Sequence, residues 1–378
     1  MKKALILCAA LLFAFAAACG GPSAPSEPVS EATPVPTAVP DEPDVITVET
    51  MEPTEAPTPE PTEEPTPEPT PTPEPTPTPE PTRVPREGDI AVNFPDYDTG
   101  VDADYSYQSD DVRIAVTVYE GTLPDVAENR DLATVYYVAD IWIRNLNSMQ
   151  YVFGRGEFNK HSEDADKCAR RVNAVLGFNG NYNSGLVVQN GVVLQDFRAK
   201  KGWNSCSACL IYKDGTFKTF YLKKEKLDID QEIANGAWIG WQFGPIILRD
   251  GEEGPDATAY PTMGYKARTM IGYYEPGHYV AVIADQRGSK ARGLNNLMMV
   301  DLMKSLGVKD AFNLDGGNGT VLTFMGEIIN KPVYNKTADG TVIYGRPLMD
   351  MLGFGEYDEA TGALQDLSTL TNVKIKGK

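Results

Sequence analysis

Hydrophobic and polar residues alternate over much of the chain beyond residue 110, and this pattern predicts many short strands. Segments 112–119 and 134–144 alternate as strands with one buried face do. The Asn-Gly pair at 190–191 and the Asp-Gly pair at 214–215 each separate two apolar runs, which predicts tight hairpins. A further hairpin is expected around 275–278, where a Pro-Gly pair interrupts two apolar runs.

Three segments are instead predicted to be helices, the last of them from the helical spacing of its apolar residues. These are 162–171, with Ser162 as its N-cap, 227–234 and 295–306. The apolar run 238–248 is predicted to be a strand. Because strands and helices intermix without a regular βαβ order, the pattern predicts an α+β fold with mixed or antiparallel sheets and a few helices.

The N-terminal residues have the composition of an export signal. Two lysines precede an apolar run, 4–18, that is too short to cross a bilayer as a helix. Small residues end this run directly before Cys19. This order predicts a lipoprotein signal over 1–19, with Cys19 as the lipidated N-terminus of the mature chain. An ordinary cleavable signal is the alternative.

Residues 20–86 are rich in Pro, Thr and Glu and cannot form a core, so they are predicted to be a disordered linker. Extended, such a linker would reach on the order of 200 Å. It contributes much of the net charge of −19, because 14 acidic and 4 basic residues precede Glu87. The predicted domain, 87–378, carries 39 acidic and 30 basic residues. A net acidic domain argues against nucleic acid as a partner.

The small number of histidines and cysteines disfavours several common kinds of active site. His161 and His278 are the only histidines, and both are expected at the surface, which disfavours a Ser-His-Asp hydrolase. Metal-ligand spacing is absent from the sequence, so neither a metal nor a cofactor is predicted, and a bound structural ion is left open. Cys168, Cys206 and Cys209 would remain after export, either buried or with one disulfide among them. Acid–base chemistry must therefore come from carboxylates.

One carboxylate has an unusual setting. The apolar run 311–314 delivers Asp315 into a loop that contains Gly316, Gly317 and Gly319. Such dense glycines indicate left-handed backbone or close approach of backbone N–H groups to a ligand. The segment is not a Walker loop, because no Gly-Lys-Ser/Thr follows. The alternative is a tight hairpin turn, for which Asp-Gly is a common signal.

Five segments in a fixed order give the chain a likeness to known proteins. They are Ala174 to Tyr182, Phe243 to Gly251, Arg268 to Gly272, Asp285 to Gly288 and Asn313 to Gly317. Across about 151–353, these segments resemble the phosphodiester glycosidase family. The resemblance implies a single domain of that fold over 87–378, and an enzyme that hydrolyses a glycosyl–phosphate linkage.

That reaction requires a carboxylate at the oxocarbenium-like centre and cationic or N–H groups at the phosphate. The phosphate leaves with a low pKa, so a general acid is less necessary than in ordinary glycoside hydrolysis. On this interpretation Asp315 is the catalytic carboxylate, and the N–H groups of Gly316 and Gly317 are oxyanion-type donors.

The resemblance implies further site residues. It places Asn179 and Arg268 in the same pocket, where Asn179 would bind substrate and Arg268 phosphate. Asp285 is either a second catalytic carboxylate or a structural partner of Arg287. Arg346 meets phosphate or forms a salt bridge. Turn or surface roles remain the alternatives for Asn179 and Arg268.

Asn313 and Thr320, at the two ends of the loop, are expected to contact substrate as well. The family usually continues Asp-Gly-Gly with a third glycine and then serines, whereas this chain has Asn318 and Gly319. Thr320 is therefore the first hydroxyl of the loop. This departure implies altered specificity or reduced activity if those hydroxyls touch phosphate.

These observations predict an exported hydrolase, lipid-anchored at a bacterial cell surface, that cleaves a sugar-1-phosphate diester resembling GlcNAc-1-phosphodiester. Its partners would be a phosphorylated envelope or extracellular glycan and, through the lipid alone, the membrane. The alternative is a non-catalytic glycan- or cell-wall-binding lipoprotein on the same fold. The oligomeric state is left open.

Overall fold

The structure is a computed structural model that describes residues 84–96, 98, 100–202, 206–258 and 264–377. These belong to one unit, Val84–Lys378. The predicted lipidation at Cys19 and almost all of the predicted linker lie outside the described residues. No helix within the described ranges is long and apolar enough to span a membrane.

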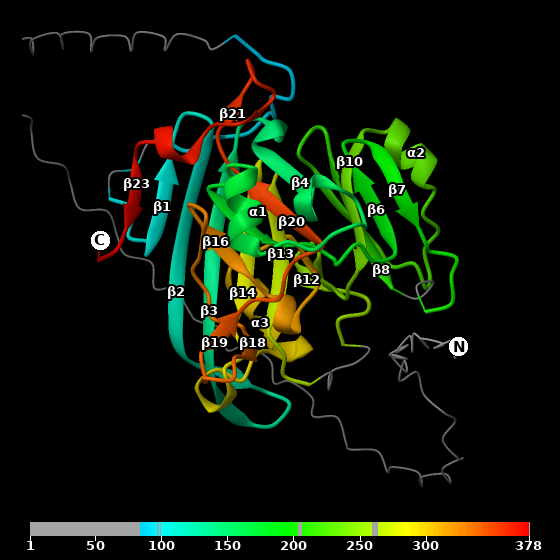
Figure 1. Cartoon of the computed structure of the whole chain (residues 1–378). Coiled ribbons are helices and arrows are strands. Elements are labelled where there is room, and N and C mark those ends of the chain that lie inside the picture. The colour runs from blue at the N-terminus through cyan, green and yellow to red at the C-terminus, as the bar shows by residue number, and fades with distance from the viewer. Residues whose placement is uncertain (1–83, 97, 99, 203–205, 259–263, 378) are drawn as a thin grey trace, which may run out of the picture. The chain divides into compact units, whose positions relative to one another are not determined.

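The largest sheet has nine strands, and its long members arise from the alternating segments of the sequence (Figure 1). In spatial order they are β12 (Glu252–Glu253), β11 (Ile246–Arg249), β15 (Asp310–Asn313), β13 (Arg268–Glu275), β14 (His278–Ala284), β3 (Arg130–Ile143), β2 (Val112–Asp125), β1 (Tyr105–Gln108) and β23 (Val373–Ile375).

Two five-stranded sheets complete the framework. The first has the order β7 (Val192–Asp196), β6 (Leu186–Gln189), β10 (Ala237–Phe243), β8 (Ser207–Tyr212), β9 (Phe217–Phe220). The second has the order β17 (Glu327–Ile328), β16 (Leu322–Phe324), β5 (Leu176–Asn179), β20 (Asp350–Phe354), β4 (Met149–Phe153). Two ribbons pair β18 (Val333–Lys336) with β19 (Val342–Tyr344), and β21 (Tyr357–Asp358) with β22 (Ala363–Leu364).

Helices are few and short among the described residues. The α-helices are α1 (Ala165–Arg171), α2 (Ile229–Ala234) and α3 (Asn296–Ser305). The 3-10 turns are η1 (Leu146–Ser148), η2 (Gly154–Gly156), η3 (Gly288–Lys290), η4 (Gly317–Gly319) and η5 (Leu367–Thr369). Antiparallel pairing between the strands, together with these few helices, confirms the predicted α+β class.

Local chemistry explains which element predictions succeeded. The 190–191 turn has φ angles of 50° and 75°, the left-handed pair that a two-residue hairpin of this kind needs. Ser162 as the N-cap of α1 was wrong, because Glu163 is held extended by a bridge to Leu348 and the helix begins only at Ala165.

The predicted single strand at 238–248 was also wrong. Its apolar residues form two strands, β10 and β11, which join different sheets. The break falls at Gly244-Pro245, where proline lacks the N–H that a sheet ladder uses and Gly244 has a φ of 98°.

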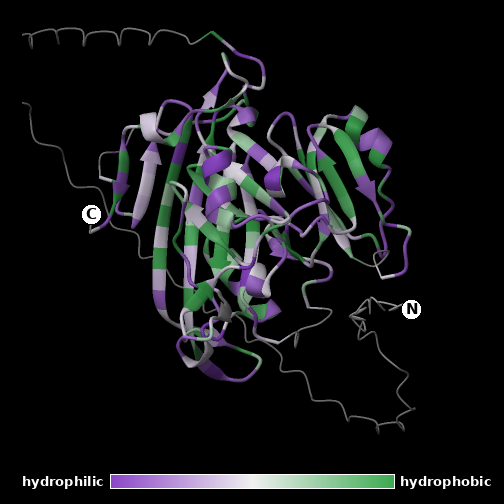
Figure 2. Cartoon of the chain, viewed as in Figure 1, coloured by the Kyte–Doolittle hydropathy of each residue, from purple (hydrophilic) through white to green (hydrophobic). Residues whose placement is uncertain are grey.

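The core has two principal parts, and β15 contributes to both. Phe312 belongs to a large apolar cluster that includes residues of all three large sheets, whereas Ala311 belongs to a second cluster that involves α3. Figure 2 shows hydrophobic residues along the strands of the sheets. Because β15 is buried on both faces, its C-terminal end is rigidly placed where Asp315 follows.

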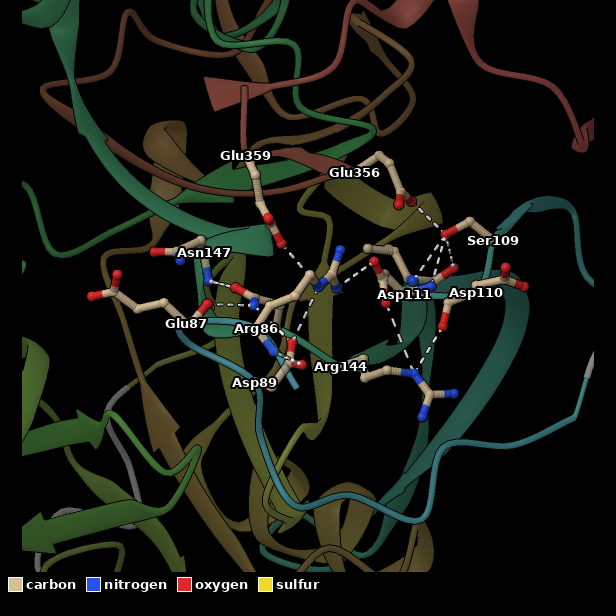
Figure 3. Close-up of polar contacts among 12 residues, drawn as sticks. Arg86, Glu87, Asp89, Ser109, Asp110, Asp111, Arg144, Asn147, Glu356 and Glu359 are labelled. Atoms are coloured by element: carbon tan, nitrogen blue, oxygen red, sulfur yellow. Dashed lines mark hydrogen bonds and ion pairs between the residues drawn. The ribbon is translucent and has the colours of Figure 1, made fainter. Parts of the chain in front are cut away.

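An ion network fastens the first described residues to the domain (Figure 3). The Arg86 guanidinium lies 2.5 Å from Asp111 Oδ2 and 3.1 Å from Glu359 Oε1. Its backbone N–H donates to Asp89 at 2.7 Å. The network thus joins the segment before β1, the β1–β2 turn and the β21–β22 turn.

Candidate active site

Asp315 emerges from β15 with its carboxylate between a backbone amide and a guanidinium. The Gly316 N–H donates to Oδ1 at 2.9 Å, and Arg346 donates to Oδ2. The Asp315 side chain is 19% exposed, so solvent reaches part of it. Burial raises the pKa of Asp315, while the positive charge of Arg346 opposes this rise. A carboxylate in this setting can act on a bound ligand.

The glycines of the loop permit close contacts. A side chain at Gly316 would stand 2.7 Å from the Ala267 carbonyl, and one at Gly319 would stand 2.9 Å from the Asp315 carboxylate. Gly317 has a φ of 62° and donates its N–H to the Ala267 carbonyl at 2.9 Å. The Gly316 N–H is bonded to Asp315 itself. Both predicted oxyanion donors are therefore already engaged, contrary to the expectation from the sequence.

Asn179, at the end of β5, holds the loop in place. Its Nδ2 donates to the carbonyls of Asp315 at 2.7 Å and Gly180 at 3.3 Å. Its Oδ1 accepts from the Thr269 hydroxyl at 2.7 Å and the Val321 N–H at 3.1 Å. These four bonds use the full capacity of the amide. Asn179 is therefore placed to position Asp315, and its binding of substrate stays a prediction.

Asp285 is likewise placed to act as a positioning residue. Its carboxylate is fully buried and accepts bonds from Arg287, from Asn330 at 2.9 Å and from the Lys331 N–H at 3.0 Å. Asn330 in turn donates to the Thr320 carbonyl at 3.1 Å. The pairing with Arg287, which was the structural alternative for Asp285, is present, and its role as a second catalytic carboxylate stays a prediction.

The Arg268 side chain points to one face of β13, and its neighbour Thr269 points from the opposite face toward Asn179. Successive strand residues point to opposite faces. The Thr269 hydroxyl meets Asn179, whereas the Arg268 guanidinium donates to the carbonyls of Leu294 and Gly264 at 3.1 and 3.2 Å. Burial lowers the pKa of Arg268 to about 10. The guanidinium is thus directed away from Asn179, and a shared pocket with phosphate bound by Arg268 stays a prediction.

Arg346 lies between Asp315 and an exposed aromatic ring. Besides its ion pair with Asp315, its guanidinium carbon lies 4.3 Å from the centre of the Tyr182 ring. Its backbone N–H donates to the Asn318 carbonyl at 2.9 Å, which ties it to the glycine loop. Of the two roles left open for Arg346, the salt bridge is present, and the partly exposed guanidinium is also placed to meet an anion.

Several polar atoms near the loop have no partner among the described residues. These are Asn313 Oδ1, Thr320 Oγ1 and Arg346 Nε. Asn313 uses its other side-chain atom to donate to the Gly244 carbonyl at 2.8 Å. Buried polar groups normally have partners, so these three atoms are candidates for contacts with a ligand or water. Contact of Asn313 and Thr320 with substrate stays a prediction.

Asp350 is a residue of the site that the sequence reasoning did not select. It opens β20, is fully buried and accepts the backbone N–H groups of Asn181, Tyr182 and Asn183 at 3.0, 2.9 and 3.3 Å. The Tyr151 hydroxyl donates to it at 2.7 Å. Burial raises the pKa of Asp350 to about 6. Its signal in the sequence was a single acid at the start of an otherwise apolar strand.

A cavity of about 190 Å³ lies elsewhere, on the β1–β2–β3 part of the large sheet, and contains none of the predicted site residues. Asp140 and Trp142 contribute to its lining. Next to it, His278 stacks between Trp142 and Tyr274 and lies 2.7 Å from Asp140. The expectation that His278 is a surface residue is corrected by this packing.

Two of the three cysteines show plain burial rather than a disulfide. Cys168 and Cys209 are buried free thiols, whereas Cys206 is half-buried. Burial raises the pKa of Cys168 to about 12, so this thiol is unreactive at neutral pH. No group of three potential metal ligands occurs within the described ranges.

Comparison with known proteins gives this geometry a family. The model of the phosphodiester glycosidase family matches residues 162–354, about half of the chain. The SPbeta prophage-derived uncharacterized protein YomE of Bacillus subtilis is 30% identical over 148 residues, which are 39% of this chain but only 22% of that protein.

A solved structure shows the same fold at low identity. The zebrafish N-acetylglucosamine-1-phosphodiester alpha-N-acetylglucosaminidase catalytic domain, auto-inhibited by its pro-peptide, superposes with a TM-score of 0.53. It is 17% identical, and the match covers 64% of this chain and 83% of that one. On the extent of the family match, the chain belongs to the phosphodiester glycosidase family.

Proposed function

We propose that the protein hydrolyses the bond between a sugar C1 and a phosphodiester, with a substrate of the GlcNAc-1-phosphodiester type. The observation that carries this proposal is the partly exposed Asp315 carboxylate, which is paired with Arg346 at the edge of the glycine loop. Membership of the family supports a glycosidase type of reaction. The site thereby combines an anion for the sugar with a cation for the phosphate.

The division of labour follows from charge. Asp315 faces the anomeric carbon and stabilises the positive charge that develops there. The C1–O bond breaks, and its electron pair leaves on the phosphate monoester. Water supplies the oxygen that ends on C1. Arg346 exchanges its contact with Asp315 for the phosphate oxygens, which it can bind in a bidentate manner.

We also propose that the substrate is an envelope or extracellular glycan and that the enzyme is lipid-anchored at a bacterial cell surface. The predicted signal, Cys19 and the linker composition support this location. A tether would bring the enzyme close to glycans of the same surface and raise its effective concentration there.

The decisive test replaces the carboxylate without changing its shape. Asp315→Asn should lower release of GlcNAc from a GlcNAc-1-phosphodiester by at least about 10³-fold, because the amide cannot stabilise positive charge. Asp301→Asn, on the exposed side of α3, is the matched control and should retain full turnover. Circular dichroism verifies that both variants are folded. Unchanged turnover by Asp315→Asn refutes the assignment.

A non-catalytic glycan-binding protein is the second candidate. It is favoured by the engagement of both glycine N–H groups within the loop and by Asn318 and Gly319 in place of the usual glycine and serines. Retention on immobilised phosphorylated glycan, with no released sugar after prolonged incubation, would support binding without catalysis.

A further inference from the structure

Tyr182 is a large aromatic residue that the fold leaves exposed next to the candidate active site. Its side chain is 46% exposed, although most large apolar residues of the described domain are buried. One face of the ring lies over the Arg346 guanidinium, which in turn contacts Asp315. The exposed part of the ring therefore borders the place where a substrate of Asp315 must lie.

The backbone holds this exposed position at a cost. Tyr182 and Asn183 both have left-handed backbone angles, with φ of 62° and 50°. Asparagine tolerates this conformation, but for a bulky residue such as tyrosine it is unfavourable and persists only where the surroundings impose it. Such backbone geometry concentrates at functional sites. An exposed ring on a strained loop is more easily explained by a ligand than by folding.

Asp350 is what imposes the loop conformation. Its fully buried carboxylate accepts three successive backbone N–H groups, from Asn181, Tyr182 and Asn183. A side chain at Gly180 would stand 2.6 Å from the same carboxylate, so only glycine allows this approach. Asn181 fixes the other side of the loop by donating to the Ser184 carbonyl at 2.7 Å.

Resting on the proposed function, we infer that Tyr182 is the platform on which the sugar ring of the substrate packs, and that Asp350 is its positioning residue. A pyranose presents an apolar face of C–H groups and a rim of hydroxyls. A tyrosine ring offers an apolar face and a polar tip, which match both features. Arg346 thereby binds the phosphate part of the substrate, and Tyr182 binds the saccharide part.

The separate binding roles of Tyr182 and Arg346 can be measured with two probes that each represent one part of the substrate. Neutral monosaccharides (GlcNAc, GalNAc, glucose, galactose and mannose) report on the platform, and inorganic phosphate reports on Arg346. Binding of both to the full chain is followed by ligand-detected NMR titration, which does not depend on turnover. Tyr182→Ala should weaken binding of the preferred sugar about tenfold and leave phosphate binding within about twofold.

Variants with matched chemistry separate the platform from general damage. Tyr182→Phe keeps the ring and should bind the sugar within about threefold of the wild type. Tyr119→Ala removes a ring that is 42% exposed on β2 of the nine-stranded sheet, and this variant should bind both sugar and phosphate as the wild type does. Asp350→Asn should weaken sugar binding as Tyr182→Ala does, while phosphate binding is retained.

The outcomes distinguish this inference from the proposed function. Equal loss of sugar and phosphate binding in Tyr182→Ala would mean that the ring only orients Arg346, which overturns the platform. Failure of the wild type to bind any of the five sugars overturns it too. Sugar binding that depends on Tyr182, without hydrolysis of a GlcNAc-1-phosphodiester, would uphold the platform and refute the proposed activity.

Discussion

Two carboxylates of the site, the half-buried Asp315 and the buried Asp350, have their charges compensated in different ways. Arg346 and one backbone N–H partner Asp315, so its negative charge meets a positive one that a phosphate could attract away. Among the described residues, the hydrogen-bond partners of Asp350 include no cation and are three backbone N–H groups and a phenol. The first arrangement suits a group that acts on a ligand, and the second suits a fixed support.

The support role of Asp350 predicts a pH-dependent stability. Its pKa is raised from an ordinary value near 4 to about 6, so the folded state binds the proton more tightly than the unfolded state does. Its contribution to the free energy of unfolding is therefore full below pH 4 and is lost as the pH rises through 6. The expected loss is on the order of 2–3 kcal/mol.

Urea unfolding of the wild type and of Asp350→Asn between pH 4 and 8 measures this contribution. Since the other titrating groups are common to both proteins, the difference between the two unfolding free energies isolates Asp350. This difference should fall with rising pH and level off above about pH 7. A difference that stays constant over this range would contradict the raised pKa.

At the level of single residues, a sequence motif can indicate which residues belong to a site, but not what each of them does there. Asp315 and Arg346 were both selected from their resemblance to family motifs, although the sequence did not pair them with each other. The hydrogen bonding of Asn179 and Asp285 could not be predicted, because it depends on how many bonds each side chain makes within the protein itself. Those partners, such as Thr269 and Asn330, come from distant parts of the chain, and spacing within a motif does not report them.

At the level of elements, the hairpins were predictable because their turn residues require particular backbone angles. The assignment of neighbouring strands to separate sheets was not predictable, since it is decided by long-range pairing. An example is β11, which follows β10 directly but pairs with β15 more than 60 residues later. Asp315 is positioned by such pairing, because β15 lies between β11 and β13.

The Arg86 network predicts a further stability effect at this level. Arg86→Ala removes the cation closest to Asp111, whose pKa burial already raises. The variant should lose about 1–3 kcal/mol of unfolding free energy at pH 7, and less at pH 4, where Asp111 is more protonated. Chemical denaturation at both pH values tests this.

The exposed pair of Lys376 with Asp102 serves as control, and Lys376→Ala should cost under about 0.5 kcal/mol. Equal losses in the two variants would contradict the structural role of Arg86.

At the level of the whole molecule, the described unit contains its own core and every residue proposed for the site. Residues 1–83 contribute none of these side chains, so their proposed roles are export, anchoring and reach. The chemistry of the site and its location in the cell should therefore be separable by mutation. The proposed lipid anchor on a long polar tether would fix the protein to one surface but leave a small soluble substrate free to reach the site.

Cys19→Ser tests this separation. Without the thiol there is no lipid attachment, so the variant should move from the membrane fraction to the soluble or secreted fraction. Its kcat/KM for a soluble GlcNAc-1-phosphodiester should match that of the wild type, because the site lies in the unit that begins at Val84. Its activity on glycan attached to the same cells should fall, since the effective concentration given by the tether is lost. Cys206→Ser is the matched control and should stay with the membrane. Continued membrane association of Cys19→Ser would refute the anchor, whereas release together with loss of soluble-substrate turnover would show that the N-terminal residues serve the site as well.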